Sequence, residues 1–162
     1  MTVQDGAGGS QRDAADPQRN MLYSAEDEVE PTCRRFSRWV ELETFVDEVV
    51  AGEFWTAELP RRWRRPTAHR VYVVRRSSSA TASLAERDRP VIHIRSGHWS
   101  SLVVLHELAH LVVHDGDPHG PVFAGVELDL IRWHVSFDMA TALGESFARH
   151  GVDVATPSTT VG

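Results

Sequence analysis

One short pattern constrains this chain more than any other feature: His106, Glu107 and His110 form the motif H-E-x-x-H. On a helix, residues four positions apart lie on one face, so the two imidazoles point at the same place. Glu107 is rotated to the flank of that pair, within reach of a water held there. Two imidazoles beside one carboxylate are suited to bind a metal ion and activate its water, so the pattern predicts a metal-binding helix.

The residues around the motif favour metal binding over a chance match. Apolar side chains precede it at 102–105 and follow it at 111–113, as in a helix buried in a core. Two histidines and a glutamate are costly in such a helix unless something satisfies them, and a metal ion with its water would do so. The alternative interpretation is a pair of core histidines that hydrogen-bond beside the glutamate.

A third protein ligand is expected, because catalytic zinc usually takes three ligands and a water. His114 lies two turns from His106, too far along a straight helix to share one ion. His119 follows a Gly- and Pro-containing break at 115–118, from which the chain can fold back. We therefore favour His119 over Glu127, which a second helix would supply. More remote candidates are His134 and Glu145.

Several other side chains are candidates for supporting roles. A second oxyanion donor could come from His114, His134 or Arg95, and the sequence does not choose among them. Asp115 and Asp117 could orient a ligand imidazole or simply end the helix. The strand expected at 90–95 would form a wall of the cleft and accept an extended peptide along its edge. His93 and His98 would then face the cleft, although surface or packing roles are commoner for a histidine.

Size and composition predict the organisation of the chain. Its 162 residues suffice for one domain, which we place at 16–152, between a disordered N-terminal tail at 1–15 and a flexible C-terminal tail at 153–162. The chain has no apolar run of about 18 residues, so no transmembrane helix is expected. The single cysteine, Cys33, reads as a structural thiol and favours a reducing, cytoplasmic location.

The expected fold class is α+β, with a small, mostly antiparallel sheet packed on helices and the metal helix buried at the centre. Hydrophobic periodicity predicts strands at 69–76 and 90–95 and a short strand at 36–42. Helices are expected over 16–31, 43–51, 121–135 and from 136 or 138 to 150. The acidic run at 26–30 is expected to form a solvated helix face.

A cluster of four arginines around Trp63, Arg61 to Arg65, could hold nucleic-acid phosphates with a stacked base. The net charge of −6 and the lack of a recognised nucleic-acid module favour an exposed loop instead. Nucleic acid therefore stays a weakly supported partner.

The motif and its surroundings resemble two groups of proteins. His106 to His110 followed by His119-Gly-Pro-Val-Phe is similar to the SprT-like and related minimal metallopeptidases, which have a zincin-like core. Most of the chain, from Gln18-Arg-Asn-Met-Leu-Tyr through this run to the segment ending near Val152, resembles small actinobacterial proteins described only as metallohydrolases. The resemblance implies His106, His110 and His119 as Zn²⁺ ligands and Glu107 as general base.

The expected function is accordingly zinc-dependent hydrolysis, with a peptide or protein as the substrate. Two alternatives remain open at this point. The protein could hydrolyse a non-peptide substrate with its metal ion, or it could be a non-catalytic, zinc-stabilised module that binds a partner.

Overall fold

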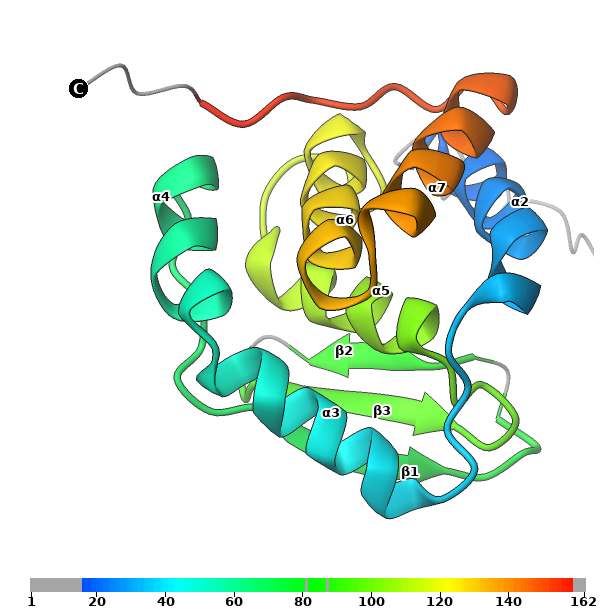
Figure 1. The fold of residues 1–162 in the computed structure, drawn as a ribbon, viewed down its shortest axis with the longest axis vertical. Helices are drawn as coiled ribbons and strands as arrows, with labels where there is room; N and C mark the ends of the chain where they lie inside the picture. The colour runs from blue at the N-terminus through cyan, green and yellow to red at the C-terminus, as the bar shows by residue number, and fades with distance from the viewer. Residues whose placement is uncertain (1–15, 81, 87, 159–162) are drawn as a thin grey trace, which may run out of the picture.

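The helix that carries the motif is the centre of the fold (Figure 1). The computed structural model describes residues 16–80, 82–86 and 88–158, so the expected N-terminal tail lies outside the described residues. Helix α5, Ser101–Val112, packs on strands β2 and β3 on one side and on helix α6, Pro121–His134, on the other. Ser100 caps α5 by accepting a hydrogen bond from the backbone nitrogen of Val103. The expectation of a buried central helix in an α+β fold is confirmed.

The sheet is mixed rather than mostly antiparallel, which corrects the expectation from sequence. Its three strands are β1, Tyr72–Arg76, β2, Leu84–Glu86, and β3, Val91–Arg95, in the spatial order β1-β3-β2. β2 pairs antiparallel with β3, whereas β1 pairs parallel with it. The chain reverses twice between β1 and β3, so the two run in the same direction, and β3 inserts between its predecessors. Because β3 is the central strand, β2 and not β3 forms the edge beside α5.

The segment before the sheet is more helical than the sequence suggested. Helix α3, Trp39–Ala51, begins inside the region 36–42, where a strand was predicted, so that prediction was wrong. A π-helical turn, Phe54–Glu58, leads into the short helix α4, Leu59–Trp63, and buries Phe54 and Trp55. The arginine-rich stretch is therefore partly helical, and its Trp63 belongs to the core.

Helices α2, Arg19–Val29, and α7, Phe137–Arg149, pack side by side, and α7 also packs against α6 (Figure 1). Glu28 of α2 accepts hydrogen bonds from three residues of α7 or its C-cap: Arg149, Ser146 and His150. These bonds lower the pKa of the Glu28 carboxyl to about 2. The Ser146 hydroxyl also donates to the backbone oxygen of Ala25, so α2 is fixed along α7.

The C-terminal segment crosses α6 in an extended course (Figure 1). Asp153 exchanges two hydrogen bonds with the buried side chain of Gln18. Further along, the backbone nitrogens of Ala155 and Ser158 donate to the carbonyls of Pro121 and Arg62. The part of the predicted flexible tail up to 158 is thus held to the domain by backbone hydrogen bonds. Across the described residues, no helix combines the length and the apolar character needed to span a bilayer.

Candidate metal centre

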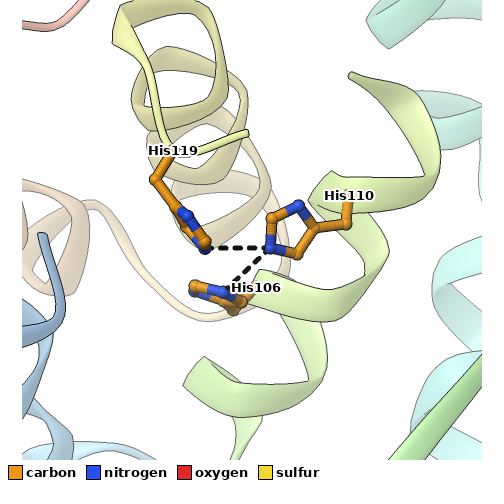
Figure 2. Close-up of side chains that lie close together, drawn as sticks. All are labelled: His106, His110 and His119. Atoms are coloured by element: carbon orange, nitrogen blue, oxygen red, sulfur yellow. Dashed lines mark hydrogen bonds between the residues drawn. The ribbon is translucent and has the colours of Figure 1, made fainter. Parts of the chain in front are cut away.

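Three histidines converge on one point between α5 and α6 (Figure 2). His106 and His110 are one turn apart on α5, and their Nε2 atoms are 3.2 Å apart. The chain leaves α5 after Val112, turns at 115–118, and returns His119 just before α6, with its Nε2 3.1 Å from that of His110. Zinc binds imidazole nitrogen at roughly 2.0–2.1 Å, which places nitrogens on a tetrahedron about 3.3 Å apart. The spacing of the three nitrogens therefore suits a tetrahedral ion.

Phe123 forms an apolar floor beneath the three imidazoles. Its ring centroid lies 4.9 Å from that of His106, 4.4 Å from that of His110 and 5.2 Å from that of His119. Phe123 is fully buried in the first turn of α6, one turn after His119. The Phe123 ring thus covers one side of the imidazoles, and the pockets that reach His106 and His110 are lined by residues of α2 and β2.

Two carboxylates fix the orientation of the ligand imidazoles. The Nδ1 of His106 lies 2.9 and 3.0 Å from the two carboxylate oxygens of Glu26, and the Nδ1 of His119 lies 2.7 Å from Asp16. A carboxylate at Nδ1 holds the proton on that nitrogen, so Nε2 keeps its lone pair. These contacts leave the Nε2 of His119 as an acceptor and turn the Nε2 of His106 towards the same point, where a metal ion would replace any proton on it.

Buried negative charge lies behind His106. Glu127 of α6 is fully buried, and neither of its carboxylate oxygens has a hydrogen-bond partner among the described residues; one oxygen is 3.7 Å from the Nδ1 of His106. Burial, and then the charge of Glu127, raise the pKa of Glu26 to about 8. Burial alone would lower the pKa of His106, but the charges of Glu26 and Glu127 outweigh it and raise that pKa well above its usual value. A metal ion at the site would compete with the proton on His106.

Glu127, the alternative third ligand from sequence, faces the Nδ1 side of His106. His119 faces the Nε2 side, where the other two imidazoles meet. Among the described residues, His106, His110 and His119 form one group able to hold a metal ion, and Glu26, His106 and Glu127 form a second that shares His106. The first group offers three imidazole nitrogens, a donor set that suits zinc and other transition metals.

Glu107 lies beside the convergence point, at the base of two adjoining pockets. Its side chain is almost completely buried, and burial raises the pKa of its carboxyl. One pocket, of about 330 Å³, runs along α2 and reaches His106 and Glu107; a second, of about 230 Å³, lies between Tyr23 and edge strand β2. Both pockets are lined by Tyr23, Ser83 and Glu107. A carboxyl in this position can exchange a proton with a water or substrate in either pocket.

The remaining sequence candidates lie elsewhere. His114 is exposed beyond the end of α5, and Glu145 is exposed on α7. His134, at the end of α6, packs edge-on against the Phe54 ring. Asp115 bonds to Arg65 rather than to a ligand imidazole, and that hydrogen bond lowers the pKa of its carboxyl.

His98 lines the larger pocket, whereas His93 does not line either pocket beside the site. Burial, and then the charge of Arg95, lower the pKa of His98, and a guanidinium nitrogen of Arg95 lies 3.0 Å from its Nε2. Arg95 also donates to the backbone oxygen of Ser78, so its guanidinium is engaged away from the three histidines.

Three of the four clustered arginines are paired with carboxylates. Arg61 bonds to Glu58, Arg62 to Asp129, and Arg65 to Asp115. The buried Asp129 also accepts from the indole nitrogen of Trp63 at 2.8 Å. These contacts join the arginine-rich stretch to the rest of the domain.

Sequence reasoning missed three residues of α2 and the turn before it: Asp16, Tyr23 and Glu26. Glu26 was assigned to a solvated face, but it is buried, which corrects that expectation. The buried residues of α2 are Leu22, Ala25, Glu26 and Val29, spaced i, i+3, i+4 and i+7. A glutamate within such an apolar stripe was the available signal. The sequence carries no comparable signal for Asp16, which reads equally well as a helix cap.

Comparison with known proteins gives no relative: no protein-family model, no curated protein and no solved structure matches the chain.

Proposed function

We propose that this protein is a zinc-dependent hydrolase and that its substrates are peptides or proteins. One observation carries the proposal: the Nε2 atoms of His106, His110 and His119 converge, at 3.1–3.2 Å for the two pairs that include His110, beside the buried carboxyl of Glu107. Three imidazoles with a neighbouring carboxylate form the arrangement used in metal-assisted hydrolysis.

Zinc bound by these imidazoles would acidify a water and polarise a substrate carbonyl. Glu107 would accept a proton from a water molecule at the site and pass it to the leaving nitrogen of the substrate. Burial supports both steps, because the raised pKa of Glu107 brings the carboxyl closer to the pH at which it must gain and lose a proton. Asp16 and Glu26 keep the imidazoles of His119 and His106 in the required orientation.

The position of β2 favours a peptide substrate. β2 is an edge strand, paired with β3 on one side, and its residues Leu84 and Ala85 line the pocket that also contains Glu107 and His110. An extended peptide can pair with such an edge through its backbone, largely independently of its side chains. A peptide bound along β2 would therefore lie beside Glu107 in this pocket.

The test combines metal analysis with a substitution of the proposed base. The wild-type protein is expected to bind one zinc ion per chain and to cleave members of a short-peptide library, with the products identified by mass spectrometry. Glu107→Gln should keep the zinc and lose roughly 10²–10⁴-fold in cleavage rate, the usual contribution of a general base. Glu43→Gln, an exposed acid on α3, is the matched control and should leave both properties unchanged.

The outcomes separate the possible functions. A wild-type protein that binds no zinc would contradict the proposal, and so would cleavage that survives Glu107→Gln. Stoichiometric zinc with hydrolysis of small esters or amides, but of no peptide, would assign a non-peptide substrate. Stoichiometric zinc without any hydrolysis would indicate a metal-stabilised binding module.

A further inference from the structure

Tyr23 stands at the boundary between the two pockets that meet at the metal centre. It belongs to the exposed side of α2, and 37% of its surface is accessible. Both pockets include it, together with Ser83 on the opposite side and Glu107 at the base. A substrate bound in either pocket beside Glu107 would therefore lie close to the Tyr23 side chain.

The ring of Tyr23 is held in place by the ligand imidazoles. It stacks on the imidazole of His106, with centroids 5.6 Å apart and planes inclined by 26°, and it meets His119 edge-on at 5.0 Å. The guanidinium of Arg19 also lies over the Tyr23 ring, 5.6 Å from its centroid. A phenylalanine could make all of these ring contacts, so they do not account for the hydroxyl group.

The hydroxyl oxygen of Tyr23 lies 3.2 Å from the Nε2 of His119. Asp16 holds the imidazole proton of His119 on Nδ1, so in the metal-free protein Nε2 is an acceptor that faces both the Tyr23 hydroxyl and the Nε2 of His110. The same lone pair cannot both accept a hydrogen bond and bind a metal ion. In the metal-bound protein the Tyr23 hydroxyl is therefore available to donate to another acceptor close to its present position.

We propose that this acceptor is the carbonyl oxygen of the substrate and that Tyr23 is a catalytic residue. As water adds to the carbonyl carbon, negative charge develops on that oxygen, and a donor placed beforehand stabilises it. No covalent bond to Tyr23 forms and its proton is not transferred; the hydroxyl strengthens a hydrogen bond. The inference rests on the proposed hydrolase function, and it supplies the oxyanion donor that none of His114, His134 and Arg95 is placed to provide.

The experiment compares Tyr23→Phe with Tyr72→Phe in the zinc-loaded protein. Tyr72 is an exposed tyrosine on β1, so its variant controls for loss of a phenol away from the site. The probe is acetohydroxamate, a small zinc-binding anion, with affinity measured by calorimetry. A hydrogen bond to a charged oxygen corresponds to roughly 10-fold or more in affinity, so Tyr23→Phe should bind the probe at least about 10-fold more weakly. Tyr72→Phe should bind it as the wild type does.

Two further measurements distinguish an oxyanion donor from a structural residue. The zinc affinity of Tyr23→Phe should stay within about 3-fold of the wild type, because the ring contacts persist. With a cleavable peptide, kcat should fall by roughly 10²–10³-fold while KM changes little, since the bond strengthens only in the transition state.

Equal probe affinity in Tyr23→Phe and wild type would overturn the inference while leaving the hydrolase proposal intact. A large loss of zinc affinity in Tyr23→Phe would also overturn it, because the residue would then support the metal rather than the substrate. Failure of the wild-type protein to bind zinc would instead reject the proposed function, and the inference with it.

Discussion

The Nδ1 atom of His119 lies 2.7 Å from the carboxylate of Asp16, although the two residues are 103 positions apart in the chain. The second carboxylate oxygen of Asp16 accepts from the backbone nitrogen of His119 at 3.2 Å. One aspartate therefore fixes both the backbone and the ring of the histidine that completes the group. The turn before α2 is thus part of the candidate metal centre.

Asp16→Asn should weaken zinc binding by roughly 10–100-fold, as removal of such a supporting carboxylate typically does. The two oxygens of Asp16 now accept separate hydrogen bonds from His119, whereas an asparagine has only one acceptor oxygen. An asparagine also lacks the negative charge that makes the His119 imidazole a better metal ligand. Competition with a chelator of known affinity measures the change. Asp47→Asn, at an exposed position of α3, is the control. Unchanged zinc affinity in Asp16→Asn would contradict the role assigned to this contact.

Glu127→Gln should change stability and metal affinity in opposite directions. Glu127 is fully buried, its carboxylate oxygens lack hydrogen-bond partners among the described residues, and its charge raises the pKa of Glu26. Removing that charge should stabilise the metal-free protein by about 1 kcal/mol, because a buried like charge is relieved. It should also weaken zinc binding by roughly 10-fold, since less negative charge lies behind His106.

Urea unfolding of the metal-free protein and zinc titration measure the two effects of Glu127→Gln separately. A variant that loses both stability and zinc affinity would show that the carboxylate is satisfied in the metal-free protein, contrary to its contacts. Asp27→Gln on the exposed side of α2 provides a control for removal of a nearby surface charge.

Gly125→Ala should destabilise the protein by about 2–3 kcal/mol, because a methyl group has no room there. An added Cβ would lie 2.3 Å from Cη2 of Trp63 and 2.5 Å from the backbone oxygen of Ala155. Gly144→Ala is the matched control within α7, where the nearest atom to an added Cβ is a Leu128 methyl at 3.9 Å. That variant should gain about 0.5–1 kcal/mol, since alanine loses less entropy in a helix. The two variants are compared by their denaturant midpoints. A shift of both midpoints in the same direction would contradict the prediction.

His134 should make the folded protein sensitive to acid. Burial lowers the pKa of His134 to about 4 from its usual value of 6.5. Between these values the unfolded chain binds a proton at this residue that the folded chain does not, so stability falls as pH decreases from about 6.5 to about 4. His134→Gln should flatten this part of the stability curve, measured by chemical unfolding of the metal-free protein. The pKa of His119 is also lowered to about 4, but His119 is present in both proteins. If stability fell with decreasing pH equally steeply in the wild type and in His134→Gln, the prediction would be contradicted.

Local periodicity predicted the parts of the site that lie close together in sequence. The spacing of His106 and His110 places both imidazoles on one face of α5, and the Gly-Asp-Pro break explains why the chain can return His119 to them. The helices at 121–134 and 137–149 were predicted nearly to the residue, because their apolar spacing and caps are strong. The region 36–42 was misassigned since alternating apolar residues over a short stretch suit a strand or the start of a helix equally well.

The order and pairing of the strands could not be predicted from local sequence patterns. β2 has only three residues, Leu84–Glu86, too few to show an alternating pattern, so its pairing with β3 had no local signal. Without β2, the sequence pointed to the strand before α5 as the edge of the cleft. In the structure β3 lies between the other two strands, so β2 forms the edge of the sheet beside the pocket.

By itself, the sequence determined that a buried helix would carry two histidines and a glutamate on adjacent faces, with a third histidine after a break. That much follows from helix geometry, which depends only on neighbours along the chain. Only the tertiary structure decided what surrounds them. Packing of α2 against α7 brings Glu26 to His106 across 80 residues and Tyr23 to His119 across 96. Such contacts depend on how complete helices pack, which no local pattern encodes.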